Sequence, residues 1–342
     1  KARAEHELDD AITTHKLPVT VSFSGGKDSL VVLDLVSSVT KNLTAIFIDT
    51  GLEHPATCNY VKWHVSSRGV PLLIASAGDA FEDNFGAFGP PAKDFRWCCK
   101  VCKLAPASEL IEKRFPEGTL TIEGNRRLES FSRSYTDLIT KNPFIPGQTT
   151  VNPIRDWTAL DVWLYIIWRG LDYNPLYDED IERVGCWMCP SSLASESVEI
   201  SRMSPELAKA WNQKLDSWAA ENGLPRGFVE HGFWRWKELP PKMRALADKL
   251  GIEAKPKRAD TLAVHVIKGV SPCAAGGFSV EAVLKMPQSR GLKQVAELLK
   301  TVGEVRLVED FGVAMVRSGN ANAKAFAGGQ IAAVGEKPKD AV

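Results

Sequence analysis

The sequence predicts an α/β protein with a doubly wound, mostly parallel sheet, a helical segment after it and a small C-terminal α+β domain. Short apolar runs alternate with helical runs through the first part of the chain, and the turns between them are short. Parallel strands need such crossover helices. Hydrophobic residues make up 44% of the 342 residues, which is enough for a large core.

The first part of the chain is expected to open with a charged helix and to continue as alternating strands and helices. In chain order, we expect a helix over 1–16, a strand over 17–23, a Gly-rich turn over 24–29, a helix over 30–39, a strand over 43–48, a helix over 55–67 and strands over 70–76 and 119–123. Pro55 suits the start of its helix, where no N–H donor is needed.

The pattern changes after Trp157, where aromatic-rich helical segments replace the strands. Helices are expected over 158–168, 205–221, 240–250 and 292–302, and strands near 262–267 and 304–316. The predicted domains are an N-terminal helix over 1–16, a main domain over 17–200, a helical extension over 201–250, a linker over 251–260, an α+β domain over 261–335 and a tail over 336–342. Because the chain starts at Lys1, we treat the first helix as a possible remnant of a longer protein.

Charge and cysteine content narrow the function classes. The 42 basic and 42 acidic residues balance, which argues against a strongly basic surface for nucleic acid or membrane. No apolar run is long enough to span a bilayer. Seven cysteines, an odd number gathered in close pairs, indicate metal or redox chemistry in a reducing cytoplasm and not a secreted disulfide framework.

A Gly-rich segment between a predicted strand and a predicted helix has the properties of a phosphate loop. Its two glycines allow a tight turn with inward N–H groups, and the following helix N-terminus adds a partial positive charge. The segment differs from the Walker A pattern, and an ordinary glycine turn with a solvated lysine is the alternative. Its residues are Ser24, Gly25, Gly26, Lys27, Asp28 and Ser29.

Two polar segments follow other predicted strands, where ligands of open α/β sheets bind. The first is a nucleotide contact or a simple strand-ending turn, and it consists of Asp49, Thr50 and Gly51. The second has three arginines in eight residues, and the planar arginine fork pairs well with sulfate or phosphate. A solvated basic stretch is its alternative. The second candidate set is Gly124, Arg126, Arg127, Ser130 and Arg133.

The cysteines form two close pairs far apart in the sequence, as a tetrahedral or cubane thiolate site requires. The pairs are Cys98 with Cys99 and Cys186 with Cys189. An iron–sulfur cluster suits adjacent cysteines better than zinc does, but zinc and free thiols stay open. The segment over 173–177 is a Pro-bearing turn expected to position the second pair, with its aromatics used for packing.

Two single cysteines are candidates for a reactive thiol. The start of a predicted helix and its neighbouring lysines would lower the pKa of Cys102. Cys273 lies in a Gly-rich loop, where an unreactive residue is the alternative. Cys58 falls within a predicted helix and is expected to be core filler.

The ordered motifs SGGKDS, DTG, Cys-Cys, GNRR, NPIRDW, YNPLYD and CxxC resemble those of phosphoadenylyl-sulfate and adenylyl-sulfate reductases, over roughly residues 19–190. The loop resembles the PP-loop of adenine nucleotide α-hydrolases. The resemblance implies a [4Fe–4S] cluster on the four paired cysteines, and nucleotide binding by the loop and the arginines. It also implies a thiolate that attacks the sulfate sulfur, and a second thiol, from a dithiol such as thioredoxin, that releases sulfite.

Two departures leave alternatives open. The family's C-terminal Glu-Cys-Gly-x-His segment is absent, so the nucleophile is Cys273, Cys102 or a partner's thiol. The complete SGGKDS loop also suits enzymes that split ATP, some of which insert sulfur into tRNA. A non-catalytic iron–sulfur subunit is a third alternative. The expected ligand is therefore adenylyl sulfate, phosphoadenylyl sulfate or ATP. A nucleic-acid partner is disfavoured. Whether the chain forms a homo-oligomer stays open.

Overall fold

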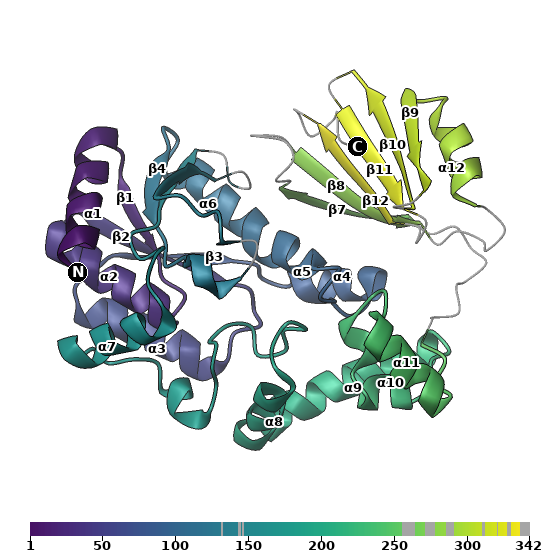
Figure 1. Ribbon diagram of the computed structural model, residues 1–342, viewed down its shortest axis with the longest axis horizontal. Helices are drawn as coiled ribbons and strands as arrows, with labels where there is room; N and C mark the ends of the chain where they lie inside the picture. Colours follow the sequence, from purple (N-terminus) through teal and green to yellow (C-terminus); the bar gives the residue numbers. More distant parts are fainter. Residues whose placement is uncertain are drawn as a thin grey trace. The chain divides into compact units, whose positions relative to one another are not determined.

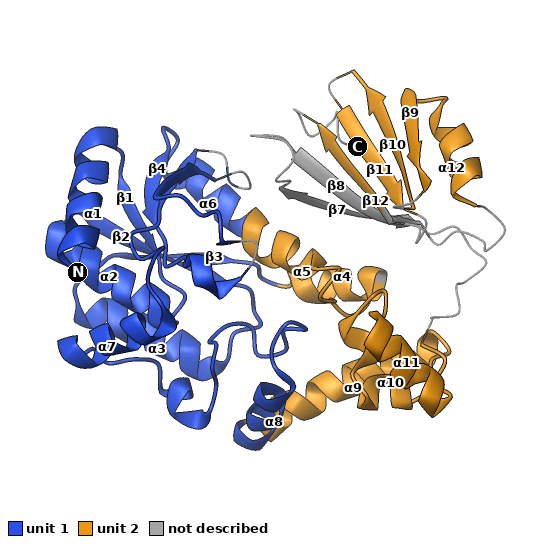
Figure 2. Cartoon of the chain, viewed as in Figure 1, with its two compact units in different colours: residues 1–78, 106–203 blue, residues 79–105, 204–342 orange. Residues whose placement is uncertain are grey.

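The computed structural model describes residues 1–130, 133–142, 145, 147–254, 264–270, 278–284, 291–309, 312–319, 321–326 and 330–335. The chain forms two compact units, coloured separately in Figure 2. Unit 1 contains residues 1–78 and 106–203, and unit 2 contains residues 79–105 and 204–342. The segment 79–105, which the sequence places inside the main domain, thus belongs to unit 2.

Unit 1 is built on a six-stranded sheet whose neighbours pair in parallel, except for the antiparallel edge strand β5. In spatial order its strands are β3 (Leu72–Ser76), β2 (Leu43–Asp49), β1 (Val19–Ser22), β4 (Thr119–Ile122), β6 (Gln148–Val151) and β5 (Ile139–Lys141). This arrangement confirms the predicted doubly wound, mostly parallel sheet.

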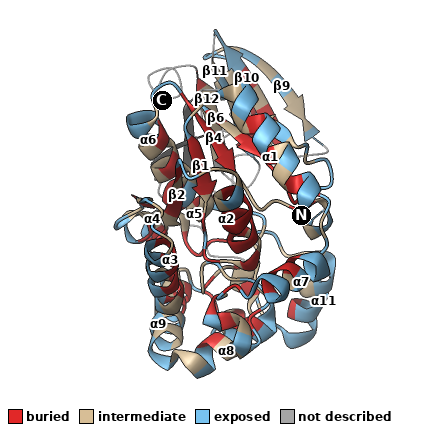
Figure 3. Cartoon of the chain, turned by 90° about the vertical axis from the view of Figure 1, so that its left-hand side faces the viewer, coloured by how far each residue is buried: buried red, intermediate tan, exposed pale blue. Residues whose placement is uncertain are grey.

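Helices cover both faces of this sheet. The chain passes outward from β1 to β3 and then returns to the other side of β1 at β4. Because crossovers are right-handed, this return puts α6 on the face opposite α1 and α2, as Figures 1 and 3 show. The helices of unit 1 are α1 (Ala2–His15), α2 (Lys27–Val39), α3 (Pro55–Ser67), α6 (Ala105–Arg114), α7 (Ala159–Arg169) and α8 (Ala194–Met203).

The core of unit 1 explains the apolar runs of its sequence. Strands β1 and β4 are buried along almost their whole length (Figure 3). Helix α2 is apolar on nearly every side because it covers the sheet while α1 and α7 pack against it. Its buried Asp34 accepts hydrogen bonds from Arg68, Tyr165 and Arg169, which satisfy the charge inside the core.

Unit 2 contains a helical part rich in aromatic side chains. Phe81 stacks on Trp97 with ring centroids 5.2 Å apart, and Phe81 and Phe85 both contact Trp211. These contacts join the segment 79–105 to the helices after residue 204. The elements are α4 (Ala80–Phe88), α5 (Trp97–Cys99), the π-helical turn η1 (Lys100–Leu104), α9 (Pro205–Glu221), α10 (Gly227–Glu230), the 3₁₀ turn η5 (Phe233–Arg235) and α11 (Pro241–Leu250).

The C-terminal part of unit 2 is an antiparallel sheet with one helix against it, which confirms the expected small α+β fold. The predicted strand over 304–316 is wrong, because a turn that includes Gly312 divides it into β9 and β10. In spatial order the sheet contains β7 (Val264–Val270), β8 (Phe278–Leu284), β12 (Gln330–Gly335), β11 (Ala321–Phe326), β10 (Val313–Ser318) and β9 (Glu304–Val308), and α12 (Leu292–Leu299) contacts β9 and β10. No helix in the described part of the chain is long and apolar enough to cross a bilayer.

Candidate functional site

The Gly-rich loop connects the end of β1 to the first turn of α2. Gly25 has a φ of 77°, and a Cβ at this position would lie 2.9 Å from Val61, so both backbone and space require glycine. The loop also bonds to itself. The Gly26 N–H donates to Ser24 Oγ over 3.4 Å, and Ser29 Oγ donates to the Gly26 carbonyl over 2.8 Å. The predicted loop therefore lies at a helix N-terminus, where anions bind readily.

The segment after β4 lies directly against this loop. A Cβ on Gly124 would lie 2.8 Å from the carbonyl carbon of Asp28, so glycine is required for this close approach. Arg126 is buried, and its Nε donates to Asp28 Oδ1 over 2.5 Å. The site thus forms between β1 and β4, where the strand order reverses and where open α/β sheets bind ligands.

The segment over 173–177 also contacts the loop. Asn174 is buried, and its Nδ2 donates to the Gly25 carbonyl over 3.3 Å. The Tyr177 hydroxyl accepts the Lys27 N–H over 2.8 Å, and the Lys27 ammonium lies 5.4 Å from the centre of the Tyr177 ring. The sequence assigned these aromatics to packing, but the structure shows that Tyr177 is a polar partner of the loop. A tyrosine so far from the loop in sequence carried no signal of this contact.

The remaining candidate arginines have acidic partners. Arg127 donates to Asp156 Oδ1 over 2.7 Å, and Arg133 is ion-paired with Glu129. Glu129 also accepts from Arg183 over 3.0 Å. Ser130 follows the 3₁₀ turn η2 (Arg127–Glu129), and its carbonyl accepts from the backbone N–H of Arg133. The structure therefore brings Arg126 to the loop, whereas Arg127 and Arg133 belong to neighbouring ion pairs.

The turn after β2 connects to the second cysteine pair. Thr50 is buried and donates through both its N–H and its hydroxyl to the Glu53 carboxylate, while the Gly51 N–H donates to Asp49 Oδ1 over 3.0 Å. Thr50 Oγ1 lies 3.5 Å from the sulfur of Cys186. Glu53 and Cys186 also pair as an isolated β-bridge. The end of a central strand thus holds one of the predicted metal ligands.

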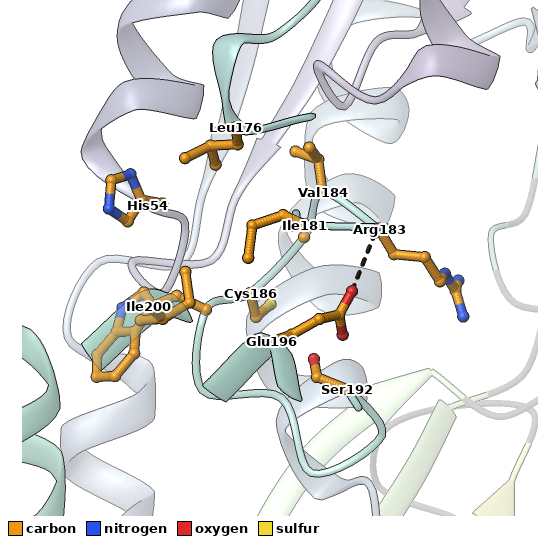
Figure 4. A pocket seen from close by; sticks show the side chains of 11 residues that line it. His54, Leu176, Ile181, Arg183, Val184, Cys186, Ser192, Glu196 and Ile200 are labelled. Carbon is orange, nitrogen blue, oxygen red and sulfur yellow. Dashed lines mark hydrogen bonds between the residues drawn. The ribbon is translucent and has the colours of Figure 1, made fainter. Parts of the chain in front are cut away.

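The loop that carries Cys186 and Cys189 is closed by a buried carboxylate. The Cys189 N–H donates to the Cys186 carbonyl over 3.1 Å, which makes a tight turn. Glu196, only 5% exposed, accepts the backbone N–H of Arg183 over 3.1 Å and that of Leu193 over 2.8 Å. Figure 4 shows this carboxylate beside Cys186 in a small pocket. Glu196 was not predicted, because no motif marks it.

The first cysteine pair lies in unit 2. Cys98 and Cys99 end α5, and the hydrogen bond from Cys98 lowers the pKa of Cys99, assisted by the charges of Lys103 and Arg96. Cys102 lies in the π-helical turn η1 and its side chain has no exposed surface.

The other two cysteines are Cys58 and Cys273. Cys58 lies in α3, and burial raises its pKa, with Asp49 and Glu53 acting in the same direction. Cys273 lies outside the described residues.

Each cysteine pair supplies two close thiols, which is donor chemistry that suits iron–sulfur clusters. The pairs belong to different units: Cys98 and Cys99 to unit 2, Cys186 and Cys189 to unit 1. Among the residues that the structure describes, no group of three or more His, Cys, Asp or Glu side chains is arranged to hold a metal ion.

Comparisons with known proteins bear on the same part of the chain. The family model of the phosphoadenosine phosphosulfate reductase domain matches residues 18–192. An uncharacterized protein of Methanocaldococcus jannaschii is 41% identical over 70% of this chain and 56% of its own length. An adenosine 5'-phosphosulfate reductase of Geobacillus kaustophilus is 29% identical over 50% of this chain and 72% of its own length.

Solved structures are also similar to this chain. Phosphoadenylyl-sulfate reductase of Candida auris is 22% identical, with a TM-score of 0.43, covering 56% of this chain and 90% of that one. The chain spans 56% and 46% of the lengths of two Methanocaldococcus jannaschii relatives, or about half of each.

Proposed function

This chain belongs to the phosphoadenosine phosphosulfate reductase domain family, and we propose that it binds an adenylylated sulfate at the phosphate loop and releases sulfite from it. The observation that carries the proposal is the contact of Gly124 and Arg126 with Asp28 in the loop. This contact places a helix N-terminus and a buried guanidinium side by side between β1 and β4, where the strand order reverses. Such an arrangement is suited to a nucleotide phosphate. Relatives named as adenosine 5'-phosphosulfate reductases favour adenylyl sulfate as the substrate.

The proposed chemistry needs two thiols. A thiolate attacks the sulfate sulfur, the bond from sulfur to the bridging oxygen breaks, and adenosine monophosphate leaves with that oxygen. A second thiolate then attacks Sγ of the S-sulfonated cysteine and forms a disulfide with it, and sulfite leaves with the electron pair of the broken sulfur–sulfur bond. The two thiols are oxidised and the sulfur is reduced, so a dithiol such as thioredoxin balances the reaction.

We assign the attacking thiol to Cys273 before Cys102. A nucleophile must reach its substrate as a thiolate, and the side chain of Cys102 has no exposed surface. Because Cys102 is buried, the remaining candidates for the attacking thiol are Cys273 and a thiol from a partner. Substitution Cys273→Ser should stop S-sulfonation of the protein, as measured by intact mass. An S-sulfonated C273S variant would pass the role to another thiol.

We propose that Cys98, Cys99, Cys186 and Cys189 hold a [4Fe–4S] cluster. Four thiols in two close pairs are the donor set that supports this proposal. When bound, the cluster would supply a one-electron redox centre tuned by hydrogen bonds and burial. The reaction above takes its electrons from thiols. Cys186→Ser should remove the visible absorbance of the anaerobically purified protein, and an unchanged spectrum would refute the ligand assignment.

A second function, ATP-dependent sulfur insertion, is favoured by one observation. All residues of the SGGKDS loop are present, and hydrogen bonds with Arg126, Asn174 and Tyr177 hold the loop in place. The deciding experiment incubates the anaerobic chain and a dithiol with adenylyl sulfate, phosphoadenylyl sulfate or ATP. Sulfite from either phosphosulfate supports the reductase. Pyrophosphate released from ATP supports the second function. If none of the three nucleotides gives a product, both enzymatic functions are overturned and a non-catalytic subunit is favoured.

A further inference from the structure

The hydroxyl of Tyr177 has an unusual position at the phosphate loop. Its oxygen accepts the N–H of Lys27, which is the first residue of α2, over 2.8 Å. A hydroxyl can accept a hydrogen bond and donate one at the same time, so Tyr177 keeps its own hydrogen to donate.

The donor hydrogen of this hydroxyl is left for another partner. Among the residues that the structure describes, none accepts a hydrogen bond from Tyr177. Burial raises the pKa of Tyr177 to about 12, so the O–H stays protonated at neutral pH. This half-buried O–H can therefore donate to an acceptor that arrives with a ligand.

The space that the hydroxyl borders is the mouth of the loop. A Cβ placed on Gly26 would lie 3.4 Å from the Tyr177 oxygen and 3.5 Å from Ser24 Oγ, so both hydroxyls border the same space in front of Gly26. Asn174 is 1% exposed, and its hydrogen bond to the Gly25 carbonyl fixes the segment of Tyr177 to the loop. The hydroxyl is thus held in place before any ligand binds.

We propose that Tyr177 is a phosphate-binding residue: its hydroxyl donates to a phosphate oxygen of the nucleotide in the loop. Because the Tyr177 oxygen accepts the Lys27 N–H, that N–H is not available to a ligand. The hydroxyl hydrogen of Tyr177 takes its place as a hydrogen-bond donor at the mouth of the loop. Its ring also lies beside the Lys27 ammonium, so one side chain positions two groups of the loop. The inference rests on the nucleotide site of the proposed function, but it is independent of the sulfate chemistry.

Equilibrium binding of adenosine monophosphate and of adenosine to the full chain tests this role, because the two ligands differ in the phosphate. Tyr177→Phe should weaken binding of adenosine monophosphate about tenfold or more and leave adenosine binding unchanged. The matched control is Tyr173→Phe, which removes a hydroxyl bonded to Asp178 near the surface and should leave both affinities unchanged. Unchanged or tighter binding of adenosine monophosphate to Y177F would overturn the proposal, since the hydroxyl would then only fill the place of a phosphate oxygen.

A second variant keeps the test independent of the stability of Y177F. Gly26 has a φ of −85°, and its added Cβ would make ordinary contacts, so Gly26→Ala should fold normally. Its methyl group would fill the space beside the Tyr177 hydroxyl. It should therefore weaken binding of adenosine monophosphate more than binding of adenosine. Equal effects on both ligands would count against a phosphate at this position. A wild-type chain that binds neither ligand would overturn the nucleotide site itself, whereas binding without sulfite release would overturn the proposed reaction alone.

Discussion

The guanidinium of Arg126, after β4, forms an ion pair with the carboxylate of Asp28 inside the phosphate loop, with 2.5 Å between Nε and Oδ1. The two residues are 98 positions apart in the chain. Their side chains are 7% and 23% exposed, so solvent screens the pair only weakly. The pair therefore ties two neighbouring strand ends into one site, and it can be tested as a unit.

Removing one partner of this pair should destabilise the protein. Arg126→Ala leaves the Asp28 carboxylate with the Lys27 ammonium alone, 3.7 Å from its Oδ2, and we expect the free energy of unfolding to fall by about 2 kcal/mol in urea titrations. The double variant R126A/D28A should regain part of that loss, because the carboxylate that lost its nearest donor is removed and the Lys27 ammonium keeps the Glu182 carbonyl as a partner. Arg226→Ala is the control: Arg226 pairs with Glu230 at the surface, and its loss should cost less than about 0.5 kcal/mol.

The close approach of Gly124 to the loop predicts a binding defect. In Gly124→Ala the new Cβ would meet the Asp28 backbone at 2.8–2.9 Å, and the loop must shift. We expect affinity for adenosine monophosphate, measured by calorimetry, to fall about tenfold. The reason is that the displaced N–H donors of the loop would no longer have good hydrogen-bond distances and angles to the phosphate. Gly86→Ala, in α4, meets nothing within 4 Å and should raise stability by about 0.5–1 kcal/mol without changing affinity. Equal affinities for wild type and G124A would contradict this role of Gly124.

The buried carboxylate of Glu196 should control access to the CxxC loop. In Glu196→Gln one of the two backbone N–H donors, of Arg183 or Leu193, loses its acceptor, at a cost of about 1–3 kcal/mol. Local opening should then become roughly tenfold more frequent. Alkylation of Cys186 in the reduced, chelator-treated chain, followed by mass spectrometry, measures this opening.

A matched control separates this effect from a general loss of charge. Glu199 lies on the same helix, α8, and pairs with Arg202 at the surface. Glu199→Gln should leave the alkylation rate of Cys186 near the wild-type value. The same rate in E196Q as in wild type would show that the carboxylate does not hold the loop.

His64 predicts a pH dependence of stability in the acidic range. Its side chain is 2% exposed against Phe23 and Tyr60, and both ring nitrogens lack a hydrogen-bond partner among the described residues. Burial lowers its pKa to about 4, with the charge of Arg68 acting in the same direction. The unfolded chain takes up this proton near pH 6.5, before the folded chain does. The contribution of His64 to stability is therefore complete above pH 6.5 and decreases as the pH falls towards 4.

Urea titrations between pH 7 and pH 4 measure this effect. We expect His64 to account for a loss of up to about 3 kcal/mol over the window. His64→Phe keeps an aromatic ring in the same apolar surroundings and should flatten that part of the profile. His6, an exposed residue of α1, provides the control, since H6F should leave the slope unchanged. An identical slope in H64F and wild type would exclude His64 as its source.

The sequence by itself determined the features that depend on neighbouring residues. Apolar runs and their period predicted β1, β2 and most helices, because backbone preference and burial pattern are properties of contiguous segments. The phosphate loop was recognisable for the same reason, as its glycines, lysine and helix start lie within six residues. The mostly parallel pairing of the strands was predicted from the helices that alternate with them, because parallel strands need crossovers.

Tertiary structure alone decided which distant side chains meet. Three arginines were equivalent in the sequence, yet only the fold pairs Arg126 with the loop and directs Arg127 and Arg133 to Asp156 and Glu129. Tyr177 reaches Lys27 across 150 positions, a contact that no local pattern encodes. The free energy of such contacts depends on distance in space, and the packing of whole elements sets that distance.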